Sequence, residues 1–166
     1  MLTMCSLSSF AQRQDELIST IKLKVEKIDA QGDLQERTLD QHTFMKEISD
    51  GGGELTGYFV KLDLVKMKME QILSSGFLEV TYYFQDSELI YAYQVERKLI
   101  GEYEDEDWIG WDFTAEPDTI FEASYYFDHQ RLIDETNRGE QYFSYPFEIQ
   151  EFLENTDQVR KTLIDN

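Results

Sequence analysis

The stretch VTYYFQDSELIYAY, residues 80–93, has the pattern of two β-strands joined by a polar turn. Its two ends are rich in Val, Ile and Tyr, residue types that favour strands. Between them lies QDSE, whose Asp and Ser favour a tight reversal of the chain. The stretch therefore predicts a β-hairpin, with Phe84 before the turn and Leu89 after it.

The same pattern occurs three times along the chain. Each copy has a Tyr-Phe pair, four further residues, and then a Leu-Ile or Leu-Val pair. The pairs are Tyr58-Phe59 with Leu64-Val65, Tyr83-Phe84 with Leu89-Ile90, and Tyr126-Phe127 with Leu132-Ile133. The apolar residues of 62–72 also fit a helical period, but agreement with the other copies favours a strand there. We expect one curved antiparallel meander sheet of about six to seven strands.

Apolar residues recur at helical spacing near both ends of the chain. The N-terminal set predicts a helix of about four turns, and the C-terminal set predicts a helix over about residues 147–164. The sets are Leu17, Ile18, Ile21, Val25 and Ile28, and Phe152, Thr156, Val159 and Leu163. With both helices packed on one face of the sheet, residues 12–166 would form a single α+β domain.

Three runs of sequence together resemble a group of exported bacterial proteins. These runs are GGELTGYF (52–59), VTYYFQDSELIYAY (80–93) and ASYYFDHQRLID (123–134). Members of the group have a GGELTxYF-like start followed by two YYFDNGKLI-like hairpins. The resemblance implies export and a meander sheet, and because the group has no assigned activity it implies no catalytic or binding residue. The turns QDSE and DHQR lack the Asn-Gly of the group, so the turn type is left open.

The chain is strongly acidic, with 34 Asp and Glu against 15 Lys and Arg and a formal net charge of −19. Such a charge repels nucleic-acid phosphates and anionic lipid surfaces, which argues against both as partners. It attracts cations or a basic protein, although an acidic surface often serves solubility alone. No apolar run approaches the roughly 20 residues that cross a bilayer as a helix.

The first eleven residues, MLTMCSLSSFA, carry no charge and end in Ser9-Phe10-Ala11. Signal peptidase requires small residues at the first and third positions before its cleavage site, and Ser9 and Ala11 occupy them. Residues 1–11 therefore predict the remnant of an export signal, and a periplasmic or extracellular location, over an ordinary N-terminus. Cys5 is the only cysteine, and Met4 before it is too large for a lipoprotein site, so lipid anchoring is not expected.

The usual catalytic signatures are missing from the sequence. The only histidines, His42 and His129, are far apart, and no G-x-S-x-G motif occurs. His and Cys do not cluster at metal-ligand spacing, and the three glycines of 51–53 are followed by Glu54 instead of the Lys-Ser/Thr of a phosphate loop. We expect no catalytic residue, no metal site and no cofactor.

One segment breaks the regularity of the hairpins. The interval between Tyr83 and Tyr126 is longer than that between Tyr58 and Tyr83, and the extra residues fall at about 101–118. This insertion contains EYEDEDWIGWDF (102–113), with both tryptophans of the chain. Long connections of this kind are usually functional or disordered, and the aromatic residues argue against disorder.

The candidate residues for binding a ligand or partner all lie in this insertion. They are Tyr103, Asp105, Asp107, Trp108, Trp111 and Asp112. Exposed indoles beside carboxylates hold sugar rings or anchor a basic protein, whereas indoles that fold inward would only cap the sheet. Calcium bound by the three aspartates is an alternative, but their spacing differs from the EF-hand pattern and favours a solvated acidic loop.

We expect an exported, non-catalytic binding protein that recognises a basic protein partner in the cell envelope. One alternative is a carrier of an apolar ligand, with a cavity under the curved sheet lined by Tyr, Phe and Met. Another is an enzyme that acts on polysaccharide through two carboxylates. Burial of Trp108 and Trp111 would discriminate, since solvent-facing indoles favour recognition and buried indoles favour a structural role.

Overall fold

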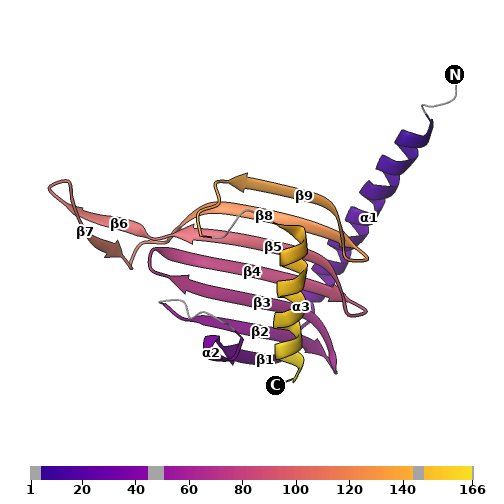
Figure 1. Ribbon diagram of the computed structural model, residues 1–166, viewed down its shortest axis with the longest axis horizontal. Helices are drawn as coiled ribbons and strands as arrows, with labels where there is room; N and C mark the ends of the chain where they lie inside the picture. Colours follow the sequence, from indigo (N-terminus) through magenta and orange to yellow (C-terminus); the bar gives the residue numbers. More distant parts are fainter. Residues whose placement is uncertain (1–4, 45–50, 144–147, 166) are drawn as a thin grey trace.

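The computed structural model describes residues 5–44, 51–143 and 148–165 and contains a seven-stranded antiparallel sheet in the order β1-β2-β3-β4-β5-β8-β9 (Figure 1). The strands of this sheet are β1 (Gln35–Asp40), β2 (Gly53–Val60), β3 (Asp63–Leu73), β4 (Gly76–Gln85), β5 (Glu88–Lys98), β8 (Asp118–Asp128) and β9 (Arg131–Gly139). The remaining elements are α1 (Cys5–Asp29), α2 (Gln41–Phe44), α3 (Ile149–Asp165) and a separate two-stranded ribbon, β6 (Ile100–Glu104) and β7 (Asp107–Asp112).

The expected fold class is confirmed. The sheet is an antiparallel meander with a helix near each end of the chain, and residues 62–72 lie mostly in strand β3. Helix α1 is longer than the four turns predicted, and α3 begins at Ile149, two residues after the predicted start, which lies outside the described residues. Among the described helices, none has both the length and the apolar character to cross a membrane.

The hydrophobic core lies between the sheet and α3. Its largest fully buried apolar side chains are Leu55, Met67, Phe127 and Leu163. The Phe152 ring of α3 lies at the centre, with ring centroids 5.8 Å from Tyr82, 5.6 Å from Tyr125 and 6.1 Å from Phe127. Because alternate residues of a strand point to the same face, these side chains come from one face of the sheet.

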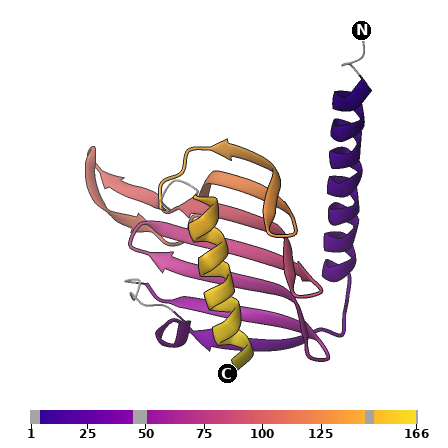
Figure 2. The same ribbon diagram turned by 45° about the vertical axis from the view of Figure 1, so that its right-hand side comes forward.

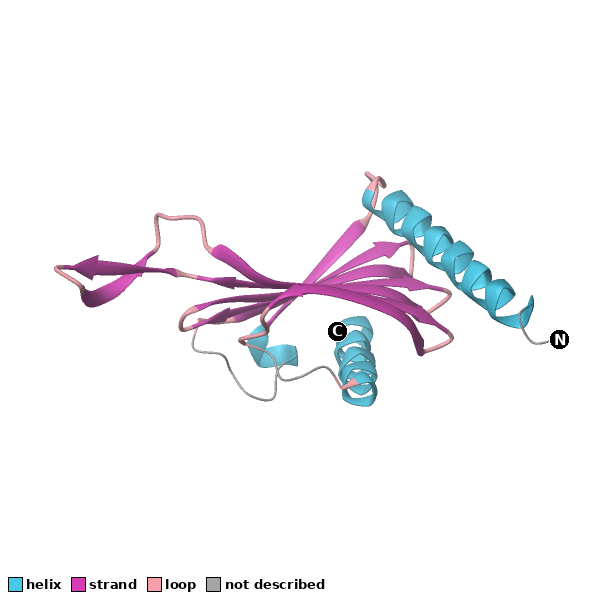
Figure 3. Cartoon of the chain, turned by 90° about the horizontal axis from the view of Figure 1, so that it is seen from above, coloured by secondary structure: helices cyan, strands magenta, loops and turns pink. Residues whose placement is uncertain are grey.

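The prediction that both helices pack on one face is wrong, because α1 lies against the face opposite to α3 (Figure 3). Tyr83 donates a hydrogen bond to the carboxylate of Asp29 in α1, and Lys22 lies 5.6 Å from the ring centre of Tyr126. Each double tyrosine therefore provides one ring to each layer: Tyr82 and Tyr125 face α3, while Tyr83 and Tyr126 face α1. Consecutive strand residues point to opposite faces, so a strand that is aromatic at successive positions is apolar on both sides.

Helix α1 covers only part of its face, and its first turns project beyond the sheet (Figures 1 and 2). Its contacts with the sheet, among the side chains described, begin at Gln14, which donates to the carbonyl of Ile133 in β9. They end at Asp29, which pairs with Lys66 at 2.7 Å. The rest of this sheet face is mostly polar, although Thr56, Thr81 and Val95 on it are buried.

Candidate functional site

The three hairpins of the sheet share one construction. A β-bulge lies beside the Tyr-Phe pair of each: between Tyr58 and Phe59, between Tyr83 and Phe84, and between Tyr126 and Phe127. In each copy the Phe pairs with the first aliphatic residue after the turn, as Phe84 pairs with Leu89. The second aliphatic residue is the extra, unpaired residue of the bulge. The repeated sequence thus encodes a repeated backbone geometry.

The β6–β7 ribbon is a fourth copy of this bulged hairpin. Its register shifts between Glu102 and Tyr103, and Tyr103 pairs with Trp108 as Phe84 pairs with Leu89. Ile109 then takes the unpaired position. The Tyr-Phe and Leu-Ile pairs do not mark this copy, because YEDEDWI (103–109) matches FQDSELI (84–90) only in the class of residue at each position.

The turns of these hairpins answer the question that the sequence left open. The two central residues have positive φ in Asp86-Ser87 (50° and 67°), Asp105-Glu106 (50° and 76°) and His129-Gln130 (47° and 60°). Positive φ at both positions is the type I′ geometry, the turn whose twist matches that of the flanking strands. In the β2–β3 turn only Lys61 has positive φ, which is the type II′ pattern.

The fourth copy differs from the other three in what covers it. Phe59, Phe84 and Phe127 are 8%, 2% and 1% exposed, whereas Tyr103 at the corresponding position is 65% exposed. Trp108, which takes the place of the paired leucine, is 55% exposed. The ribbon projects beyond the end of the sheet, away from α3 (Figures 1 and 3). It therefore presents to solvent an aromatic pair at the positions where its three sister hairpins have a buried Phe and a buried or half-buried Leu.

The aromatic side chains of the ribbon pack on one another. The rings of Trp108 and Trp111 meet edge to face, with centroids 5.6 Å apart and planes at 72°. The Tyr103 ring covers Gly101, where a Cβ would lie 2.9 Å from a ring carbon. Trp111 is half-buried and Trp108 is exposed, so the tryptophans are not both folded inward. The result is a preformed aromatic surface extended by exposed Ile109.

The three candidate aspartates are not brought together. Asp105 lies in the turn and Asp107 begins β7, while Asp112 ends β7 at the root of the ribbon. Asp112 accepts hydrogen bonds from Thr114 Oγ1 at 2.6 Å, Thr114 N at 2.8 Å and Ala115 N, and these bonds lower the pKa of its carboxyl group. Asp112 therefore orders the chain that follows the ribbon. In the described parts of the chain, no group of three or more His, Cys, Asp or Glu could hold a metal ion.

The acidic residues of the ribbon and its return segment have no cationic partner among the described residues. They are Glu102, Glu104, Asp105, Glu106, Asp107, Asp112, Glu116 and Asp118. The sheet differs, because Glu79 there lies 3.0 Å from Lys68 and 3.7 Å from Arg97, and Glu122 pairs with Arg138. A negative field is thus concentrated on the part of the molecule that also exposes aromatic rings.

Glu96 and the two histidines lie outside the ribbon, in surroundings that suggest a structural role. Glu96 in β5 is fully buried and accepts the backbone N–H groups of Tyr142 at 2.7 Å and Phe143 at 2.8 Å, which ties the segment after β9 to the sheet. His129 lies in an exposed turn at 3.0 Å from Glu88, and His42 lies in α2. The histidines are not part of a catalytic arrangement with a nucleophile in the described residues.

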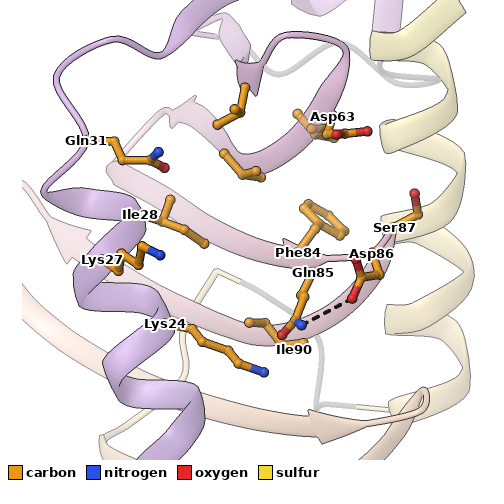
Figure 4. A pocket seen from close by; sticks show the side chains of 13 residues that line it. Lys24, Lys27, Ile28, Gln31, Asp63, Phe84, Gln85, Asp86, Ser87 and Ile90 are labelled. Carbon is orange, nitrogen blue, oxygen red and sulfur yellow. Dashed lines mark hydrogen bonds between the residues drawn. The ribbon is translucent and has the colours of Figure 1, made fainter.

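Two of the recesses in the described part of the chain lie outside the α3 core. One of about 490 Å³ lies between α1 and the hairpin turns (Figure 4). Its floor is apolar, with Ile28 and Ile90, and Lys24 and Lys27 stand at its rim. A second recess of about 530 Å³ lies on the polar face near the root of the ribbon, lined by Glu54, Glu70, Glu79, Phe77, Pro117 and neighbouring residues.

Neither family models nor curated proteins nor solved structures match this chain.

Proposed function

We propose that this protein is a non-catalytic binding protein whose β6–β7 ribbon recognises a basic protein partner. The observation that supports the proposal is the exposure of Tyr103 and Trp108, which occupy positions that are buried or half-buried in the other three hairpins. In the sheet, α3 covers the apolar side chains of the hairpins and removes them from water. The rings of the ribbon would be covered in the same way only by another molecule.

The chemistry of the ribbon favours a cationic protein over a neutral ligand. Aromatic side chains bury a large area at small entropic cost, so they supply most of the affinity in many protein interfaces. Unpaired carboxylates around them speed the approach of a positive surface and repel acidic competitors. A sugar would use the rings but would gain little from the field of so many unpaired acids.

Export is part of the proposal. The uncharged start, the Ser9-Phe10-Ala11 sequence and the resemblance to exported proteins support it. Because the described contacts of α1 with the sheet begin at Gln14, cleavage after Ala11 would leave them in place. N-terminal sequencing of the protein isolated from its own cells is expected to begin at Gln12, and a protein retained in the cytoplasm with its start intact would contradict export.

Affinity capture tests the proposed binding. The protein is immobilised at low salt and exposed to a cell-envelope extract, beside the variants Trp108→Ala and Leu62→Ala. Leu62 is the matched control, because it is an exposed apolar residue in the β2–β3 turn, at the opposite end of the sheet. We expect a basic protein that the wild type and Leu62→Ala retain, that Trp108→Ala loses, and that about 0.5 M salt releases. Capture that is insensitive to both Trp108→Ala and salt would contradict the proposal.

A second candidate function is that of an apolar-ligand carrier, favoured by the recess of Figure 4 with its apolar floor and lysine rim. A ligand with an apolar chain would fit the floor, and its polar head would lie near Lys24, Lys27, Asp63 and Asp86. Organic extraction and mass spectrometry of the purified protein would detect it. The polysaccharide enzyme stays a prediction without a favoured site, since Glu70 and Glu79 in the larger recess are paired with Lys68.

A further inference from the structure

We infer that the partner covers the ribbon with a basic amphipathic α-helix that presents arginine and apolar side chains on one face. This inference rests on the proposed function and names the element that binds. Its template is inside the molecule, because α3 already covers three hairpins of the same construction.

The way in which α3 and its neighbours cover the sister hairpins is specific. The Phe152 ring lies parallel to Phe127, at 3° and 6.1 Å, and the Arg160 guanidinium lies 5.8 Å from the ring centre of Phe84. Phe59 lies beneath Arg37, at 5.2 Å, and Arg37 donates hydrogen bonds to the carbonyls of Leu163 and Ile164 at the end of α3. Each phenylalanine is thus covered by an aromatic ring or an arginine that belongs to α3 or is bonded to it.

The spacing of these contacts defines a stripe along the helix. Phe152, Thr156, Val159 and Leu163 recur every three or four residues, and Arg160 lies beside them. A helix that crosses strands rises 1.5 Å per residue, while strands are spaced about 4.8 Å apart, so it passes roughly one strand per turn. The ribbon has two strands, and a helix of about two turns would therefore cover Tyr103, Trp108 and Trp111.

Charge determines which helix fits. The acids of the ribbon are unpaired, and arginine over an aromatic face is a favourable contact that Phe59 and Phe84 already make. Helix α3 is a poor match itself, because Glu151, Glu154, Asp157 and Asp165 outnumber Arg160 and Lys161. A second copy of this chain, with its net charge of −19, is disfavoured for the same reason.

The orientation of the side chains argues against an added strand. Side chains of a strand stand roughly perpendicular to the sheet, so Tyr103 and Trp108 cover a face of the ribbon and leave its edges to the backbone. A strand added at an edge would gain backbone hydrogen bonds but would leave the rings exposed. A helix laid across the face buries them, as α3 does in the sheet.

Synthetic peptides test the inference with the full-length protein. The probe has the sequence of α3 with Glu151→Lys, Glu154→Lys, Asp157→Lys and Asp165→Lys. One control peptide has the same composition in an order that breaks the stripe, and another carries Thr156→Pro, which breaks the helix. Binding is measured by calorimetry and tryptophan fluorescence at low salt, and helix formation by circular dichroism.

We expect the probe to bind and to become helical, and both control peptides to bind at least about tenfold more weakly. Trp108→Ala and Tyr103→Ala in the protein are each expected to lower its affinity for the probe by about tenfold, as the loss of a central aromatic residue does in other interfaces. Leu62→Ala is expected to leave the affinity unchanged. Glu104→Gln with Glu106→Gln is a second variant, expected to weaken binding and to flatten its salt dependence.

Four results would overturn the inference. Equal binding of all three peptides, lost in Trp108→Ala, would mean recognition by charge and aromatic contact without a helix, and would leave the proposed function standing. Binding unaffected by Trp108→Ala would place the probe on the α3 core. Dimers of the protein that Trp108→Ala dissociates would identify a second copy as the occupant. Failure of every basic peptide, together with failure of the envelope capture, would remove the inference and the proposed function together.

Discussion

Hairpin β4–β5 and the β6–β7 ribbon are built alike and placed differently. Both have a type I′ turn of two residues, an aromatic residue paired with a large apolar residue, and an unpaired Ile in the bulge. In β4–β5 the pair is Phe84 with Leu89, buried under α3, and in the ribbon it is Tyr103 with Trp108, open to solvent. The difference teaches that one hairpin construction serves as core or as surface, according to whether a helix lies over it.

The largest loss of stability is expected from a substitution at an aromatic residue that α3 covers. Phe127→Ala removes a ring that is 1% exposed and stacked on Phe152, and should lower the free energy of unfolding by about 3–5 kcal/mol. Tyr103→Ala at the equivalent position of the ribbon should change it by no more than about 0.5 kcal/mol. Urea unfolding followed by circular dichroism measures both. Similar losses in the two variants would break the comparison, because they would mean that the ribbon is also packed.

High pH should destabilise the sheet through its buried tyrosines. Burial raises the pKa of Tyr93 and of Tyr125 to about 12, with a contribution to Tyr93 from Glu122. A tyrosine of the unfolded chain ionises near pH 10, so the folded state holds its protons more tightly between these values. Stability is therefore fully present below about pH 10 and falls as the pH rises toward 12. Urea midpoints that stay constant from pH 9 to 11 would contradict this.

Substitutions in the turns are expected to change the free energy of unfolding by a smaller amount. Ser87 has positive φ (67°), which costs a residue with a Cβ more than it costs glycine. We expect Ser87→Gly to raise the free energy of unfolding by about 0.5–1 kcal/mol, since the relief of backbone strain exceeds the entropy that glycine adds to the unfolded chain. Glu106→Gly makes the same change in the ribbon. It should alter hydrogen exchange within the ribbon while the global unfolding midpoint stays the same.

The smallest effect on the fold is expected from removal of the ribbon. Strands β5 and β8 pair directly, from Tyr91 with Tyr126 to Lys98 with Asp118, so residues 100–117 lie outside their ladder. Replacement of these residues by a short glycine-containing turn should shift the melting temperature by only a few degrees. The same variant should lose the basic partner in the capture experiment. A variant that fails to fold would show that the ribbon belongs to the core.

Much of the fold could be predicted from the sequence because local pattern and tertiary contact agree there. The Tyr-Phe and Leu-Ile pairs mark the three sheet hairpins, and the apolar stripe of 152–163 marks α3. Strand β1 was not predicted, because its side chains are mostly exposed and its structure depends on pairing with β2. The faces of the helices were missed because the double tyrosines are apolar on both sides of the sheet.

The position of the candidate site could be predicted from the sequence, but its backbone geometry and its exposure could not. Its composition distinguished residues 101–118, while its backbone geometry was hidden by the replacement of Phe by Tyr103 and of Leu by Trp108. Exposure of these side chains depends on where α3 lies, which no local pattern encodes. The separation of Asp112 from Asp105 and Asp107 likewise follows from the hairpin register, which was not predicted for this segment.

The direct pairing of β5 with β8, which has one register shift between Glu96 and Arg97, has a consequence for how such a molecule changes over time. The ribbon joins the sheet at a single seam, so one hairpin can be exchanged for another without touching the layers beneath. The seam between Lys98 and Asp118 is thus the natural place to graft a new specificity.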